Sequence, residues 1–205
     1  VVERTQQNVE LVLEREPPDG AMVRVQPPDQ LPDITVMMLI DCSDSMNTMV
    51  DDLNEAGNVA GEKTELFKLV KQNASAVLRE LREIHGRDAD VRIGLILFGL
   101  EQPAEAVKND LRMLEYGVYR TRNIDPLSVN WFAKLDDTIS SLRPSRDTPL
   151  YNSIVYACNI AKDELTAEKT FVYVFSDGVN LLNSKPYRST KTASDVRQAV
   201  DALNA

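Results

Sequence analysis

Oxygen-bearing side chains gather where a strongly apolar segment ends. The run ITVMMLI at 34–40 is followed directly by DCSDS at 41–45. In an extended chain, residues i, i+2 and i+4 point the same way, so Asp41, Ser43 and Ser45 share one side. Polar groups at the end of a buried strand need partners. The pattern therefore predicts that something binds here.

Two later segments carry similar groups. Thr148 stands between Asp147 and Pro149, a sequence typical of a helix start, and Asp177 follows the apolar run KTFVYVF. As simpler alternatives, Thr148 could serve only as a helix cap, and the serines after Asp41 could bond only to loop backbone.

The combined set predicts a site for a hard cation. It offers two carboxylates and three hydroxyls, from Asp41, Ser43, Ser45, Thr148 and Asp177. Mg²⁺ prefers such oxygen ligands, and Mn²⁺ or Ca²⁺ are alternatives. With only two carboxylates the ion would stay partly positive, so a carboxylate from outside could become its sixth ligand.

Apolar strands alternate with amphipathic helices from residue 33 onward. We expect strands at 34–40, 90–99 and 169–178, an edge strand within 111–119, and helices at 62–84, 128–142, 148–165 and 194–205. This order predicts an α/β fold with a doubly wound, mainly parallel sheet. Ligands of such sheets bind outside the carboxyl ends of the strands, where the oxygen-bearing residues would meet.

Three other segments are interpreted as structural. Residues 1–32 predict a β-hairpin extension and a proline-rich linker, distinct from a main domain at 33–205. The acidic stretch 46–62 suggests a solvated loop, with a gate or partner contact as the alternative. His85, the single histidine, is expected to cap a helix end.

Composition excludes some function classes. A net charge of −9 argues against nucleic-acid binding and against attraction to an anionic membrane. No apolar run approaches the ~18 residues of a membrane span. Cys42 and Cys158 fit two buried thiols in a reducing, cytoplasmic compartment, although a disulfide between them stays open.

The three polar segments resemble one known family. DCSDS is similar to the D-x-S-x-S motif of von Willebrand factor A domains, RDTPLYNSI with Thr148 looks like their second metal loop, and VFSDG with Asp177 looks like their third. Together these form the metal-ion-dependent adhesion site of that family. The resemblance covers residues 33–205.

The resemblance implies roles that spacing alone does not give. Ser43, Ser45 and Thr148 would ligate the ion through hydroxyls, and Asp41 and Asp177 directly or through water. Family members bind partner proteins, often through a partner Asp or Glu that completes the metal shell. The chain looks closer to intracellular bacterial members than to adhesion proteins. Those members tend to act as adaptors or subunits beside AAA+ ATPases, in metal chelation, or in stress and defence systems.

Two features depart from the family pattern. Asp44 stands where the family usually has a small residue, so an extra carboxylate lies in the metal loop. The family also normally adds at least one strand and one helix after the point corresponding to Ala205, so the domain is expected to be incomplete at its C-terminal end.

Two alternatives compete with a metal-dependent interaction domain. A phosphotransfer enzyme with an aspartate nucleophile needs a general acid two residues later, and that position is Ser43. No glycine-rich phosphate loop or G-x-S-x-G motif is present, and we expect no enzyme. The other alternative is a scaffold whose metal site is vestigial.

Overall fold

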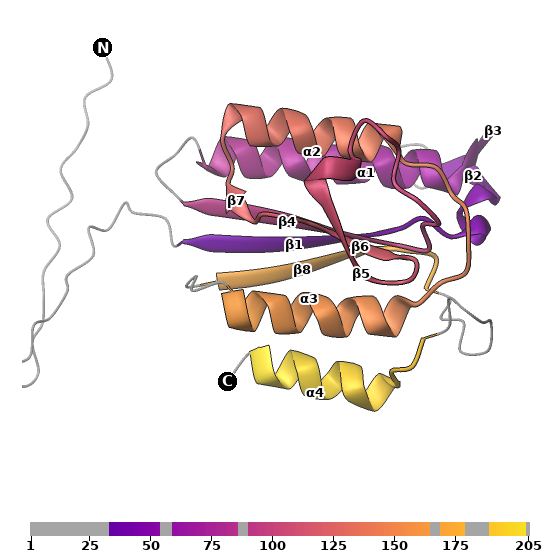
Figure 1. Ribbon diagram of the computed structural model, residues 1–205. Coiled ribbons are helices and arrows are strands. Elements are labelled where there is room, and N and C mark those ends of the chain that lie inside the picture. Colours follow the sequence, from indigo (N-terminus) through magenta and orange to yellow (C-terminus); the bar gives the residue numbers. More distant parts are fainter. Residues whose placement is uncertain (1–32, 54–58, 86–89, 165–168, 179–188, 204–205) are drawn as a thin grey trace, which may run out of the picture. The chain divides into compact units, whose positions relative to one another are not determined.

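The computed structural model describes residues 33–53, 59–85, 90–164, 169–178 and 189–203, which build a sheet with helices on both faces (Figure 1). The order of the sheet is β5 (Leu111–Glu115), β6 (Val118–Thr121), β4 (Val91–Phe98), β1 (Ile34–Asp41) and β8 (Lys169–Phe175), and a short β7 (Asp125–Pro126) pairs with β4. β1 runs parallel to both β4 and β8, whereas β5, β6 and β7 pair antiparallel. The predicted α/β class is confirmed.

Helices α1 (Leu66–His85) and α2 (Val129–Ser141) cover one face of the sheet. Helix α3 (Leu150–Glu164) covers the other face, and α4 (Ala193–Leu203) packs on α3 (Figure 1). The described elements therefore form layers with the sheet between helices, as the alternation of strands and helices predicts.

The central strand β1 is buried on both faces. Val36, Met38 and Ile40 belong to the core beneath α1 and α2, whereas Met37 and Leu39 belong to the core beneath α3. This alternation explains why the strand is apolar without interruption. The strand ends at Asp41, which is itself buried, and the chain stays partly in the core through Cys42 and Met46.

Most predicted elements are present with shifted ends. The strands expected at 34–40, 90–99 and 169–178 are β1, β4 and β8, and the helices expected at 128–142, 148–165 and 194–205 are α2, α3 and α4. His85 is the last residue of α1, and its Nδ1 accepts a hydrogen bond from the Val91 backbone N–H at 3.3 Å, so its role is structural.

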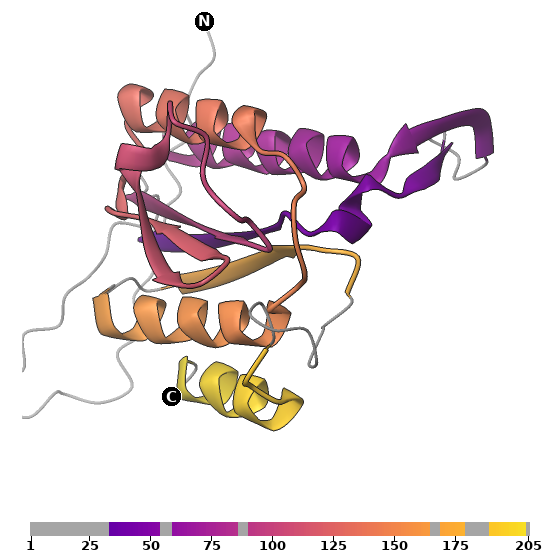
Figure 2. The same ribbon diagram turned by 45° about the vertical axis from the view of Figure 1, so that its right-hand side comes forward.

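The interpretation of 46–62 as a loop is wrong, and so is the helix start at 62. A 3₁₀ turn (Asp44–Asn47) leads into β2 (Met49–Leu53), which pairs antiparallel with β3 (Val59–Glu65). A two-stranded ribbon outside the main sheet needs no apolar periodicity, so the sequence gives little signal for it. The ribbon lies beyond the N-terminal end of α1 (Figure 2).

The predicted edge strand at 111–119 is a hairpin. β5 and β6 pair antiparallel around Tyr116 and Gly117, and Gly117 has a φ of 81°. A left-handed glycine suits such a tight turn. β5 is the edge strand on this side of the sheet.

The opposite edge is β8, which among the described residues pairs only with β1. It exposes Phe171, Tyr173 and Val174. The strand and helix expected after Ala205 stay a prediction.

The chain divides into the units Val1–Gln30 and Leu31–Ala205. The hairpin expected at 1–32 lies outside the described residues. Within the part of the chain that the structure describes, no helix combines the length and apolarity needed to cross a membrane.

An ion pair between a buried arginine and a partly exposed glutamate ties the edge hairpin to α3, and its removal is testable. Arg120 is 4% exposed, and its two terminal nitrogens each donate to a Glu164 carboxylate oxygen at 2.7 Å. We expect Glu164→Gln to lower the free energy of unfolding at pH 7 by about 1.5–3 kcal/mol, nearer the lower value because Glu164 is partly exposed. Glu105→Gln, in an exposed pair with Lys108, is the control and should cost under about 0.5 kcal/mol.

The loss of stability caused by Glu164→Gln should depend on pH. The hydrogen bond from Arg120 lowers the pKa of Glu164 below its ordinary 4.5, so the pair stabilises the fold fully above that pH. Its contribution disappears as pH falls through the lowered value. Urea unfolding at several pH values measures this. An equal penalty at neutral and strongly acidic pH would contradict it.

Candidate metal site

Parallel pairing brings the ends of β1, β4 and β8 to one edge of the sheet. Asp41 is level with Phe98, and Ile40 is level with Phe175. One residue further along β8, Ser176 therefore lies level with Asp41. The pairing of backbones thus places two polar side chains together that are far apart in sequence.

The carboxylate of Asp41 is fully buried and hydrogen-bonded on both oxygens. Oδ1 accepts from the Ser43 backbone N–H at 2.9 Å, and Oδ2 accepts from the Ser176 hydroxyl at 2.7 Å. Burial raises the pKa of Asp41, the hydrogen bonds from Ser43 and Ser176 lower it, and the negative charge of Asp177 raises it again. Asp177 is therefore near enough to repel Asp41, and its own side chain is exposed.

The two serines of the first loop lie together. Ser43 Oγ and Ser45 Oγ are 3.0 Å apart; Ser43 is buried and Ser45 is exposed. Asp41, Ser43 and Ser45 thus form a row from the core to the surface. The extra carboxylate of Asp44 is exposed, and its backbone N–H donates to the Arg146 carbonyl at 2.8 Å.

The segment that carries Thr148 is bonded to this loop. Ser43 forms a parallel β-bridge with Arg146, and the Ser145 backbone N–H donates to the Cys42 carbonyl at 2.8 Å. Thr148 lies two residues after Arg146. It is buried, and α3 begins shortly after it at Leu150. The structure therefore brings together the three segments that contain the predicted ligands.

Gly99 permits the close approach of these segments. It has a φ of 72°, and a Cβ added there would lie 2.8 Å from the Ser43 nitrogen and 3.1 Å from the Asp147 carbonyl oxygen. Only glycine combines that conformation with that lack of space. The Ser145 hydroxyl also donates to the Gly99 carbonyl at 3.2 Å.

The residues present fit a hard divalent cation. Asp41 is buried without an ion pair to any described Lys or Arg, and a second carboxylate lies near it. In the described ranges no three His, Cys, Asp or Glu side chains form a metal-binding group, so an ion would depend on hydroxyl oxygens as well. Mg²⁺ accepts such ligands and retains water in the remaining positions.

Sequence reasoning missed three residues that shape the site. Ser176 holds Asp41, while Ser145 and Arg146 bind the first loop through backbone hydrogen bonds. For Ser176 a signal existed, because it follows β8 immediately, just as the first motif follows β1. Backbone contacts of residues 145 and 146 leave no signal in residue type.

The cysteines are not candidate ligands. Cys42 and Cys158 are free and buried, which confirms the prediction of two buried thiols. Burial raises the pKa of both, most strongly for Cys42, so neither favours the thiolate form that binds metals.

Substitution of Gly99 tests the packing of the loops. Gly99→Ala should lower the free energy of unfolding by about 2–5 kcal/mol. The loss combines the penalty of a left-handed backbone at alanine with overpacking against Ser43. Gly178→Ala is a matched control, because Gly178 has a φ of 83° but no atom within 4 Å of an added Cβ, so only the backbone penalty of about 1–2 kcal/mol applies. Denaturant unfolding measures both, and equal losses would contradict the close approach.

No protein-family model matches the sequence, and no curated protein matches it. Among solved structures, the PilB minor pilin from Streptococcus sanguinis is 17% identical over 80% of this chain and 35% of the pilin chain, with a TM-score of 0.49. The vWF domain of the type V pili tip protein Mfa5 from Porphyromonas gingivalis is 19% identical over 76% of this chain and 43% of that chain, with a TM-score of 0.45. The chain spans less than half of either protein. Both TM-scores are below 0.5, so the assignment of the site depends on its own geometry.

Proposed function

We propose that this chain is a protein-interaction domain of the von Willebrand factor A type, which binds a partner through Mg²⁺. The ion would be held by Asp41, Ser43, Ser45, Thr148 and Asp177. An Asp or Glu of the partner would complete its coordination. Mn²⁺ and Ca²⁺ are the alternative ions.

The observation that carries this proposal is the buried carboxylate of Asp41, which pairs with no Lys or Arg of the described ranges. A buried charge without an opposite charge is costly, and the nearby negative charge of Asp177 adds to the cost. A bound divalent cation supplies the missing positive charge and a position that accepts a further carboxylate. The two hydrogen bonds to Asp41 hold its carboxylate in a fixed orientation beforehand.

Exposure divides the ligands into two groups. Asp41, Ser43 and Thr148 are buried and would hold the ion from below, whereas Ser45 and Asp177 are exposed at the rim. A partner would therefore approach from the rim. This arrangement favours binding to a protein surface and assigns no catalytic step to the site.

The biological setting follows from the same proposal. The domain would act as an adaptor or subunit of a larger complex, for which an AAA+ ATPase is one candidate partner. Its two buried free thiols support a reducing compartment such as the cytoplasm. A scaffold with an unused metal site is the competing interpretation, and response to Mg²⁺ separates the two.

Thermal unfolding with and without Mg²⁺ tests the site. At a Mg²⁺ concentration 100 times the dissociation constant, the free energy of unfolding of the wild type should rise by about 2.7 kcal/mol. Asp41→Asn should gain nothing, and Asp201→Asn on α4 should respond like the wild type. Without metal, Asp41→Asn should be at least as stable as the wild type. A raised pKa means that ionised Asp41 costs stability above that pKa.

A wild type that gains no stability from Mg²⁺, Mn²⁺ or Ca²⁺ would favour the scaffold. If the site binds metal, affinity capture from native extract tests its use. Proteins retained by the wild type and Asp201→Asn in Mg²⁺, but lost with chelator and with Asp41→Asn, would be the partners. Identical capture by Asp41→Asn would assign binding to another surface.

A further inference from the structure

A basic cavity adjoins the candidate metal site. It has a volume of about 410 Å³ and is lined by Lys68, Lys71 and Arg143, together with Asn47, Phe67 and Pro144. We call it the basic cavity below.

The chain connects this cavity to the metal loop on two sides. Asn47 comes two residues after Ser45 and ends the 3₁₀ turn. Pro144 precedes Ser145, whose backbone N–H donates to the Cys42 carbonyl. The wall of the basic cavity and the metal loop are therefore continuous.

The three cations of the basic cavity have no ion pair within the described residues. Lys71 Nζ donates to the Ser140 carbonyl at 3.3 Å, and an Arg143 terminal nitrogen donates to the Leu142 carbonyl at 2.9 Å. Both are neutral acceptors. Glu65 also lines the basic cavity, so one carboxylate faces three cations.

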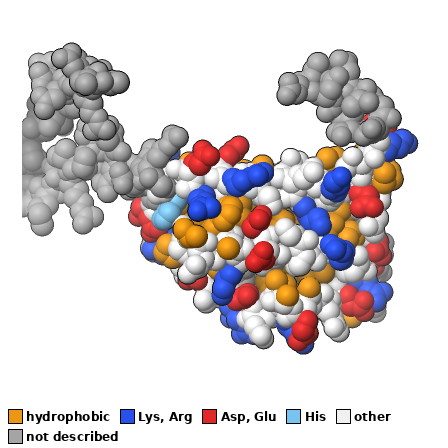
Figure 3. Space-filling model, turned by 90° about the horizontal axis from the view of Figure 1, so that it is seen from above, with side chains coloured by type: hydrophobic (Ala, Val, Ile, Leu, Met, Phe, Trp, Pro, Cys, Tyr) orange, Lys and Arg blue, Asp and Glu red, His pale blue; other side chains and the backbone are white. Residues whose placement is uncertain are grey.

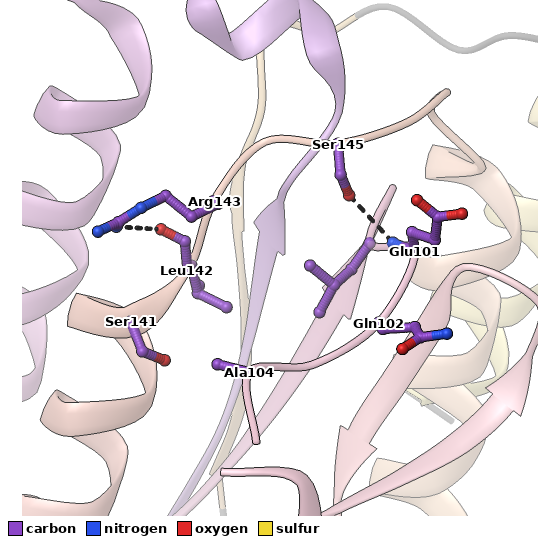
Figure 4. Close-up of a pocket in the computed structure, with 8 residues that line it drawn as sticks. Glu101, Gln102, Ala104, Ser141, Leu142, Arg143 and Ser145 are labelled. Carbon is purple, nitrogen blue, oxygen red and sulfur yellow. Dashed lines mark hydrogen bonds between the residues drawn. The ribbon is translucent and has the colours of Figure 1, made fainter. Parts of the chain in front are cut away.

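The orientation of Arg143 directs its charge to this cavity. Arg143 also borders a second cavity of about 440 Å³, where Glu101 lies on the opposite side. Its side chain points away from Glu101, whose backbone N–H is held by the Ser145 hydroxyl (Figure 4). Glu101 pairs with Arg146 at 2.6 Å and not with Arg143.

This grouping of cations costs stability. Lys68 and Lys71 lie in the first two turns of α1, which has no acidic residue in its first turn. The helix dipole disfavours positive charge in the first turn, and therefore at Lys68. Partial burial of Lys71, and then the charge of Arg143, lower the pKa of Lys71, while the charge of Glu65 opposes this. In a chain with a net charge of −9, such a cluster points to a role in binding.

We propose that the basic cavity binds a second carboxylate of the same partner segment that reaches the metal site. The partner would then present an acidic peptide, with one carboxylate at the metal and another at Lys68, Lys71 and Arg143. This inference rests on the proposed function. An extended peptide advances roughly 3.3 Å per residue, so a short acidic segment spans neighbouring sites.

Charge distribution favours an acidic peptide over a nucleic acid. Acidic and basic side chains alternate over the face formed by α1 and α2, with Lys and Arg close together on its right-hand half (Figure 3). The exposed carboxylates Asp44, Asp51 and Asp177 lie in the metal loops and the β2–β3 ribbon. A continuous phosphate backbone would meet these charges, whereas a peptide carries its carboxylates at separate points.

Binding of a labelled hexaglutamate peptide tests the proposal. Fluorescence anisotropy would compare the wild type with Lys68→Gln/Lys71→Gln and with Arg143→Gln, each in Mg²⁺ and in chelator. Lys162→Gln/Lys169→Gln removes two exposed lysines elsewhere and is the matched control. We expect both cavity variants to bind about tenfold more weakly, equivalent to about 1.4 kcal/mol, and the control to bind normally. Stabilisation by Mg²⁺ should be unchanged in all of them.

The outcomes separate this inference from the proposed function. Normal peptide binding by the cavity variants, or no binding by the wild type, overturns the inference. The metal site is then still tested separately, by the stabilisation that Mg²⁺ produces. Binding that needs the cavity cations but survives chelator also overturns the inference, because the peptide then binds without the metal site. Displacement of the peptide by a single-stranded oligonucleotide at equal concentration would assign the cavity to phosphate and overturn the inference.

Discussion

The buried carboxylate of Asp41 is the constraint around which this edge of the sheet is organised. It lies in the core at the last residue of β1, and its two oxygens accept hydrogen bonds from Ser43 in the following loop and from Ser176 just after β8. Those bonds orient the charge without neutralising it. The left-handed Gly99 and the backbone bonds of Ser145 and Arg146 are needed because three loops must pack closely around this carboxylate.

Much of this arrangement could be predicted from sequence, because the core strands carry a strong signal. The run ahead of Asp41 is apolar on both faces, and parallel pairing then determines which strand ends meet. Strand order therefore predicts that Asp41, Ser43 and Asp177 lie near one another, and the structure brings their loops together. Thr148 depended on a helix-start signal, and its segment is bonded to the first loop.

What could not be predicted has weak or non-local causes. The β2–β3 ribbon is stabilised by backbone pairing, and its polar residues gave no periodicity to detect. The hairpin at 111–121 depends on Gly117 adopting a left-handed turn, which residue type permits but does not require. The Ser176–Asp41 bond joins residues 135 positions apart, so it follows from register and not from any local motif. The basic cavity likewise combines α1 with the segment after α2.

The edge strand β8 is connected directly to the candidate metal site. Among the described residues β8 pairs only with β1, so its outer edge offers backbone N–H and C=O groups to another strand. The residue after β8 is the serine that holds Asp41. A chain that aligned along β8 would stiffen or shift that serine by way of continuous backbone. The orientation of the Asp41 carboxylate therefore depends on the position of the β8 backbone.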